Sequence, residues 1–539
     1  MPGPTTSESV CRGIFPTPHN DEFQTRTLYE VLNRSCREIR LIRLHITDHN
    51  SLIQCDLLPP VSLSNVKGEY SAISYCAGDP NNTRPILLNG ARFNVFANLA
   101  HALDITRDFW TKNFPDQPTS CLIWADQICI DQTNLAERSH QVGFMPSIYS
   151  SAARTLVCLS TTTEHNNTRD IEWLLQLHAT VPPGDDYYAY YFRLEHHLRT
   201  QLLSRRPHHH HHTTITTTND NPEGKHAKAF VSGWLAFYDT VFRSPWWLRT
   251  WVYQEFISSA HRGIHFLYGR ASVAWSHVSE VLPTLRKYRD LGHLGGSSGA
   301  ELGARQAQVA DVVDAVHFFV VSKMRFDRAG PCDLLELLAR SRHLRSTDAR
   351  DRVYAFLGLV REDYGIVPDY SPENGIERLL VDVARRVVMR DRTLDILSYA
   401  CEARGDLSRR LPSRVPDWTC GGCGELRGRS VKEPGEKDTA WLPRVHESGK
   451  LEVCGCKIGT FGKGPVLFVE VQDIAHWDGW GQEGDELWGL IGARSAFILR
   501  EVSGGFRLVK EANLWGPGPV DLEERMRQNG MQCQSIFIV

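Results

Sequence analysis

The first half of the chain alternates between two hydrophobic patterns. Short runs rich in Val, Ile, Tyr and Cys alternate with longer segments in which apolar residues recur every three or four positions. The short runs predict strands and the longer segments predict helices, in the order strand, helix, strand, helix, strand: 69–78, 94–110, 121–130, 134–152 and 154–160. Pro146 should bend or divide the second helix. Asn134, with Glu137 three residues later, predicts a capped start for that helix.

Repeated strand–helix–strand units predict parallel strands joined by right-handed crossovers. We therefore expect an α/β domain with a Rossmann-like or flavodoxin-like parallel sheet over residues 36–290. A low-complexity insertion at about 163–228 interrupts it, and its five consecutive histidines (208–212) predict a loop. The rest of the chain divides into a flexible N-terminal lead, a helical region and a small, mainly β C-terminal region: 1–35, 305–420 and 440–539.

Composition excludes some classes of partner. A formal charge of −3 with 42% hydrophobic residues indicates a globular protein with no general attraction to nucleic acid. The first residues lack the basic and apolar regions of a signal peptide, and no run of about 18 apolar residues would span a membrane. We therefore expect a cytoplasmic protein whose 14 cysteines are reduced. Two close cysteine pairs, Cys420 with Cys423 and Cys454 with Cys456, leave open a structural zinc site.

Three aspartates follow predicted strands, at the edge of the sheet where α/β proteins bind ligands: Asp79, Asp126 and Asp131. Asp126 has two interpretations. Its carboxylate either accepts backbone N–H groups of the following loop, or binds a ribose hydroxyl or takes part in acid–base chemistry. Asp131 and Gln132 more simply order the turn into the next helix.

Glu255 lies late in an aromatic helix that Ser244 and Pro245 begin. Burial would raise the pKa of its carboxyl group unless a cation pairs with it. Arg249 is six residues earlier and does not share a helical face with Glu255, so we expect Arg138 or an arginine of another element as the partner. Glu255 is then either half of a buried ion pair or a functional carboxylate. The nearby tryptophans can form a stacking platform for a nucleotide ring or part of the core.

Four segments resemble, in order, the conserved boxes of the fungal heterokaryon-incompatibility (HET) domain. They are YSAISYCAGDP (70–80), LIWADQICIDQTNLAERSHQVGFMPSIYSSA (122–152), SPWWLRTWVYQEF (244–256) and DARDRVYAFLGL (348–359). The sequence departs from the family pattern at Ala77, Ala125 and Asp131, where the family has Trp, Ile and Asn.

The resemblance implies a signalling or effector module in non-self recognition and programmed cell death, which acts through protein partners: a self/non-self sensor or homotypic HET contacts. YSAISY also resembles the first box of Toll/interleukin-receptor (TIR) domains, some of which cleave NAD. That likeness implies no bound cofactor, but NAD as a candidate substrate, with Glu255 and Asp126 as candidate catalytic carboxylates. Candidate positions for binding the substrate are Tyr75, Gly78, Asp79, Trp247 and Trp251.

Overall fold

The fold is that of a computed structural model, which describes part of the chain. The described residues are 29–46, 52–116, 120–161, 244–279, 318–400, 410–420, 442–462, 467–469, 481–512 and 530–539, with residues 175, 241, 316 and 407. They fall into two compact units, Met1–Pro331 and Cys332–Val539. The lead before residue 29, the histidine run and Cys423 lie outside the described residues, as does the predicted insertion apart from residue 175.

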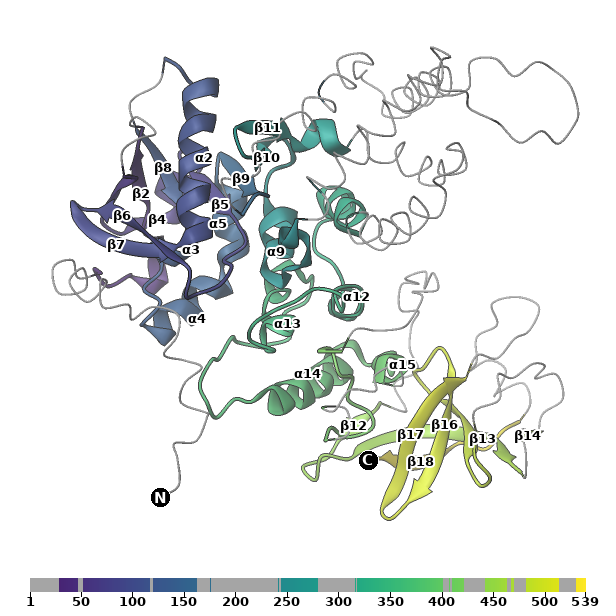
Figure 1. Ribbon diagram of the computed structural model, residues 1–539. Coiled ribbons are helices and arrows are strands. Elements are labelled where there is room, and N and C mark those ends of the chain that lie inside the picture. The colour runs from purple at the N-terminus through teal and green to yellow at the C-terminus, as the bar shows by residue number, and fades with distance from the viewer. Residues whose placement is uncertain are drawn as a thin grey trace, which may run out of the picture. The chain divides into compact units, whose positions relative to one another are not determined.

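The first unit is built on a mixed sheet with the strand order β11-β10-β9-β5-β8-β2-β3-β6-β7 in the part of the chain described (Figure 1). These strands are β2 Ile42–His45, β3 Gln54–Leu57, β5 Ser71–Ser74, β6 Thr83–Leu88, β7 Ala91–Phe96, β8 Ser120–Trp124, β9 Arg154–Cys158, β10 Ile264–Tyr268 and β11 Ala271–Ala274. A separate short pair joins β1 (Glu38–Ile39) to β4 (Val61–Ser62).

The α/β class predicted from the sequence is confirmed. The parallel arrangement holds for the neighbouring strands β10, β9, β5 and β8. The strands that follow on either side, β2 and β11, run antiparallel to their neighbours. Every residue of β5 is buried, as is typical of a parallel strand in the middle of a sheet.

Helices cover the sheet of the first unit. They are α2 Ala97–Asn113, α3 Asp126–Cys129, α4 Leu135–Gly143, α5 Met145–Ser151 and α9 Thr250–Ser258, with the 3-10 turns η1 Arg34–Cys36, η2 Leu63–Val66, η4 Pro245–Leu248 and η5 His261–Gly263. Helix α2 lies across the sheet and contacts β2, β6, β7 and β10 (Figure 1). Helix α5 packs against α9 and η2.

Pro146 divides the predicted second helix, since it occupies the first turn of α5 after α4 has ended. Two predicted boundaries were wrong. The helix expected over 94–110 begins only at Ala97, because the residues before it form β7 in a hairpin with β6. The strand expected over 121–130 ends at Trp124, and Asp126 begins the short helix α3.

The second unit combines helices with a small closed barrel. Its helices are α12 Leu334–Arg340, α13 Asp351–Tyr354, η7 Leu357–Leu359, α14 Ile376–Asp391 and α15 Ile396–Ala400. Its strands are β12 Arg444–Val445, β13 Leu451–Phe461, β14 Leu467–Val469, β15 Glu486–Leu490, β16 Ala496–Val502, β17 Gly505–Ala512 and β18 Gln534–Ile538. Strands β13, β15, β16 and β17 pair antiparallel in succession. Strand β18 then closes the barrel, antiparallel to β13 and parallel to β17.

One disulfide contradicts the expectation that all the cysteines are reduced. Cys456 in β13 is bonded to Cys533, just before β18. The strand register explains the pairing, because Cys454 lies opposite Ser535 and Gly455 opposite Gln534, which brings the next pair of residues together. Cys456 is therefore not a zinc ligand here, and Cys454 is a free, buried thiol. Among the described residues, no group of three or more potential ligands could hold a metal ion.

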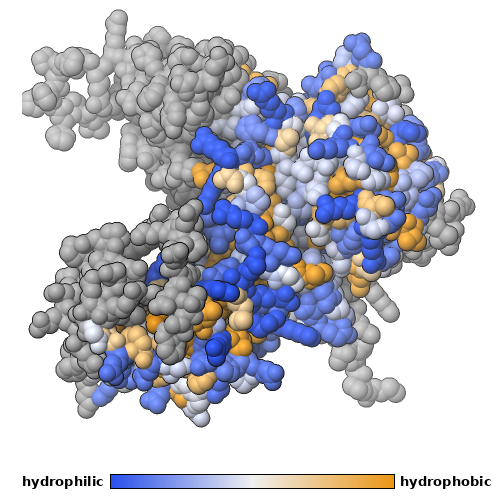
Figure 2. Space-filling model, turned by 180° about the vertical axis from the view of Figure 1, so that it is seen from behind, coloured by the Kyte–Doolittle hydropathy of each residue, from blue (hydrophilic) through white to orange (hydrophobic). Residues whose placement is uncertain are grey.

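No helix in the described part of the chain is both long and apolar enough to cross a membrane. On the face shown in Figure 2, hydrophilic and hydrophobic residues are interspersed over the surface that is not grey. That view therefore presents no broad apolar area among the described residues.

Candidate functional site

The carboxyl ends of β5 and β8 meet at one edge of the first sheet, because the two strands are parallel neighbours. Strand β9 lies on the other side of β5, so the chain passes across β5 between β8 and β9. Such a reversal is where open α/β sheets bind ligands. Ser74 ends β5 and Tyr75 follows it, while Asp126 comes two residues after the end of β8. Helix α9 brings Glu255 to the same place.

A chain of hydrogen bonds links η4, β5 and α9. The indole N–H of Trp246 donates to the hydroxyl oxygen of Ser74 over 2.8 Å. The hydroxyl of Ser74 in turn donates to a carboxyl oxygen of Glu255. All three side chains are buried, and Glu255 is only 5% exposed. The single hydroxyl hydrogen of Ser74 is thus committed to the carboxyl group.

Arg249 lies beside this carboxyl group, contrary to the helical spacing argument. It precedes α9 in an extended conformation, so it does not belong to the helical face of Glu255. Its guanidinium donates to the main-chain oxygen of Tyr75. Its positive charge also lowers the pKa of Glu255. The nearby arginine whose charge acts on Glu255 is therefore Arg249, which the helical spacing had argued against.

Asp126 joins the same cluster through Tyr75. The Tyr75 hydroxyl donates to Oδ1 of Asp126 over 3.0 Å, and the backbone N–H of Gln127 donates to the same oxygen over 2.7 Å. The second bond is the one that the loop-ordering interpretation predicts. The side chain of Gln132 donates to the main-chain oxygen of Asp126 over 2.8 Å, which further fixes the turn. Asp126 as a residue is half-buried.

Burial dominates the electrostatics of the cluster. It raises the pKa of Glu255 to about 7, and the negative charge of Asp126 adds to the rise. The charge of Arg249 and the hydrogen bonds of Ser74 and Tyr149 act in the opposite direction. Burial lowers the pKa of Arg249, but the nearby acidic groups, Glu255 foremost and Asp126 among them, together more than offset this and the net pKa is raised. Glu255 can therefore exchange a proton near neutral pH while Arg249 stays charged.

A buried ion pair holds the segment after β8. Arg40 binds the carboxylate of Glu137 over 2.7 Å and donates to the main-chain oxygen of Cys129 over 3.2 Å. Glu137 also accepts the backbone N–H of Asp131 over 2.8 Å. Asn134 caps α4 as predicted, by accepting the backbone N–H of Glu137 over 3.1 Å. The side chain of Glu137 was expected to complete that cap but instead pairs with Arg40, a residue 97 positions away.

The other predicted binding positions differ in burial, and some lie in the core while others lie at the surface. Trp247 is fully buried and its indole N–H donates to the Val241 main-chain oxygen over 2.7 Å, so it has no open ring face. Trp251 is half-buried against the core of the sheet. Gly78 has a φ of +79°, and a Cβ there would meet the amide nitrogen of Asn98 at 2.5 Å. Asp79 is exposed and accepts the backbone N–H of Asn81 over 2.9 Å.

The structure therefore brings Tyr75, Asp126 and Glu255 into one polar cluster. Gly78 and Asp79 lie in the loop beyond it, and Trp247 lies in the core. Sequence patterns missed Ser74, Arg249 and Tyr149. Ser74 carried a usable signal, because a polar side chain in a strand that is otherwise buried needs a partner. The cluster combines a titratable carboxyl group, a fixed cation and the carboxylate of a half-buried aspartate, a set able to accept a proton or to bind sugar hydroxyls.

Comparisons with known proteins bear on residues that form this cluster. Residues 70–255 match the sequence model of the family described as heterokaryon incompatibility protein (HET). The chain is also similar to heterokaryon incompatibility protein 6, OR allele, of Neurospora crassa, with 26% identity over 421 residues, or 70% of this chain. The alignment covers 57% of the length of that relative. No solved structure matches the chain.

Proposed function

We propose that this chain, whose residues 70–255 match the HET family and which resembles a fungal heterokaryon incompatibility protein, is an effector of non-self recognition. In this role it triggers programmed cell death. In this proposal the polar cluster around Glu255 is the functional site of the domain. Protein partners, either a self/non-self sensor or a second HET domain, control it. The cytoplasm is the proposed location.

The observation that carries this proposal is the hydrogen bond between Ser74 and Glu255. Ser74 lies near the start of the matched segment, and Glu255 is its last residue. Ser74 and Glu255, near the two ends of the matched segment, thus belong to one polar cluster with Arg249 and Asp126. A charged cluster inside an apolar core lowers stability unless each group is paired, so its presence favours a functional role.

Controlled expression in a fungal host tests the effector role. We expect induction of the full chain to reduce the number of viable cells relative to an empty vector. The same level of a variant with Ser74→Ala and Glu255→Gln should leave viability unchanged. Full viability on induction of a folded, soluble wild-type chain, with and without a cell that carries an incompatible partner allele, would contradict the effector proposal.

A second candidate function is the hydrolysis of NAD, which the TIR-like first box suggests. In that reaction the bond between nicotinamide and ribose breaks, the nicotinamide nitrogen keeps the electron pair, water adds to the ribose carbon and one proton is released. Glu255, whose pKa burial raises to about 7, would stabilise the cationic ribose when ionised. Asp126 would bind the ribose hydroxyls.

Nicotinamide release from NAD tests this candidate independently of cell death. Purified wild-type protein at high concentration should release nicotinamide, and Glu255→Gln should not. If neither protein releases nicotinamide while the wild type still kills cells, NAD hydrolysis is wrong and the effector proposal stands.

A further inference from the structure

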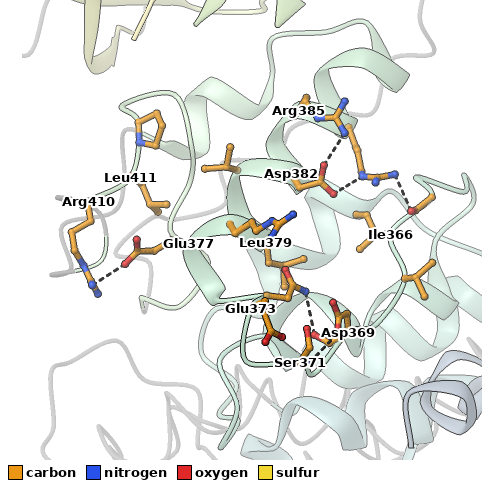
Figure 3. Close-up of a pocket in the computed structure, with 17 residues that line it drawn as sticks. Ile366, Asp369, Ser371, Glu373, Glu377, Leu379, Asp382, Arg385, Arg410 and Leu411 are labelled. Carbon is orange, nitrogen blue, oxygen red and sulfur yellow. Dashed lines mark hydrogen bonds and ion pairs between the residues drawn. The ribbon is translucent and has the colours of Figure 1, made fainter. Parts of the chain in front are cut away.

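A groove of about 790 Å³ lies in the second unit, and none of the residues that line it belongs to the HET match. Three parts of that unit line it: the segment 365–374, the polar side of α14 and residues 410–412. Figure 3 shows Ile366 and Asp369 on one side of the groove and Arg410 with Leu411 on another. Neither the family match nor the cluster around Glu255 explains a groove at this place.

The spacing along α14 explains why the groove has a charged floor. Arg378, Val381, Asp382 and Arg385 recur at intervals of three and four residues and so share one face of the helix. Helix α14 buries six residues in the unit, of which only Leu379 also lines the groove: Leu379, Leu380, Val383, Ala384, Val387 and Val388. The groove therefore lies over the side of α14 that does not pack into the core.

One wall of the groove is held at both ends and free in the middle. Arg386 donates to the main-chain oxygens of Tyr364 and Gly365, over 3.0 and 2.8 Å. At the other end Arg350 donates to the main-chain oxygens of Ser371 and Asn374, over 2.9 and 3.0 Å.

Between these two anchors, the main-chain groups of Ile366 and Val367 form no hydrogen bond with any residue that the structure describes. Val367 is also 76% exposed, the second most exposed of the large hydrophobic residues described. Because Pro368 follows it, the backbone of Val367 favours an extended conformation. The stretch thus offers unused N–H and C=O groups beside an apolar side chain.

Charges of both signs border this free stretch. Glu377 binds Arg410 over 2.8 Å, and Asp382 binds Arg385 over 2.8 Å. The exposed side chains of Asp369, Glu373 and Arg378 remain around the open part of the groove. A phosphate-rich ligand would need an excess of positive charge, which these residues do not provide.

We propose that this groove binds an extended peptide segment of a protein partner. The main chain of the peptide pairs with Ile366 and Val367, in the way that strands add to an open edge. An apolar residue of the peptide covers Val367, an acidic residue binds Arg378, and a basic residue binds Asp369 or Glu373. The proposal concerns partner recognition by the second unit, so it stands or falls separately from the role of Glu255.

Selection from a displayed library of short random peptides on the full-length protein tests the proposal. We expect enriched peptides to carry an apolar residue flanked by one acidic and one basic residue. A fluorescent copy of the most enriched peptide should bind the wild type, and Val367→Asp should weaken binding at least about tenfold. Met389→Asp is the matched control, because Met389 is 52% exposed on α14 but does not line the groove.

Charge reversal separates recognition from folding. Arg378→Glu should weaken binding of the original peptide, and a peptide whose acidic residue is replaced by lysine should recover it. A merely unfolded variant would bind neither peptide. The proposal is wrong if no peptide is enriched, if Val367→Asp and Met389→Asp bind equally well, or if the exchanged peptide does not restore binding to Arg378→Glu.

Discussion

Ser74 and Glu255 are 181 residues apart in the sequence, yet the hydroxyl of Ser74 donates a hydrogen bond to the carboxyl group of Glu255 inside the first unit. This contact fixes α9 to the carboxyl end of β5. It also places a carboxyl group whose pKa burial raises to about 7 next to Arg249 and near Asp126. We therefore expect the protonation state of Glu255 to change in the neutral pH range.

The stability of the protein should fall as this group ionises. The pKa of Glu255 is about 7 in the folded protein and near 4.5 in the unfolded chain. Its contribution is therefore fully present below about pH 4.5 and is lost as the pH rises through 7. At about 1.4 kcal/mol for each pKa unit, the loss amounts to roughly 3 kcal/mol. Urea unfolding of wild type and Glu255→Gln over this range measures it.

The difference between the two proteins isolates Glu255 from all other titrating groups. Relative to the wild type, Glu255→Gln should gain stability between pH 4.5 and 7 and show no further change above about pH 8. Exposed Glu69 provides a control, since Glu69→Gln should follow the wild-type profile. A constant difference between Glu255→Gln and wild type at all pH values would show that the pKa of Glu255 is not raised.

Removal of the Ser74 hydroxyl should leave two buried groups without their partner. In Ser74→Ala the indole N–H of Trp246 has lost its acceptor and Glu255 has lost a donor. We expect a loss of about 1–3 kcal/mol in the free energy of unfolding. Trp246→Phe in the same background should cost less than it does alone, because the indole N–H is already unpaired there. Additive effects in this double-mutant cycle would contradict the shared hydroxyl.

The ion pair between Arg40 and Glu137 should be needed to keep the turn after β8 in place. Both side chains are almost completely buried. Arg40→Met leaves the Glu137 carboxylate unpaired and should cost about 3–5 kcal/mol of folding free energy. The double variant Arg40→Met with Glu137→Leu should be more stable than Arg40→Met alone. If chemical denaturation places the double variant below the single one, the remaining charge is not the cause of the loss.

The bond between Cys456 and Cys533 should stabilise the barrel of the second unit. It closes a segment of 77 residues and holds the strand that completes the barrel. Cys533→Ser should lower the free energy of unfolding by roughly 2–4 kcal/mol. A reducing agent should lower the melting temperature of the wild type and leave that of Cys533→Ser unchanged. Equal melting temperatures of oxidised and reduced wild type would show that the bond has no stabilising role.

Local patterns predicted those parts of the fold that depend on neighbouring residues. The strand and helix order of the first unit, the division at Pro146 and the cap at Asn134 all follow from short-range signals. The hairpin of β6 and β7 was missed because its second strand runs directly into α2 with no turn residue between them. The predicted length of β8 was too great. Most of the buried residues of α3 are also apolar, so the hydrophobic pattern continues past the end of the strand.

Long-range partners could not be predicted in the same way. Glu137 has the spacing of a capping residue. Its side chain instead binds Arg40, which lies between β1 and β2 and is 97 residues away in the sequence. Arg249 was set aside on helical spacing, which does not apply because α9 begins only at Thr250. The disulfide follows from the register of two strands, which single residues do not reveal. Glu255 and Asp126 were found because a carboxylate in an apolar context is informative in itself.

The effector role of Glu255 is tested most directly by viability in a fungal host at equal levels of soluble protein. Wild type and the exposed control Glu69→Gln should both reduce viability, and Glu255→Gln should not. Circular dichroism and the melting temperature establish that Glu255→Gln is folded. If folded Glu255→Gln kills as efficiently as wild type, the cluster around this carboxyl group is structural and the proposed site is wrong.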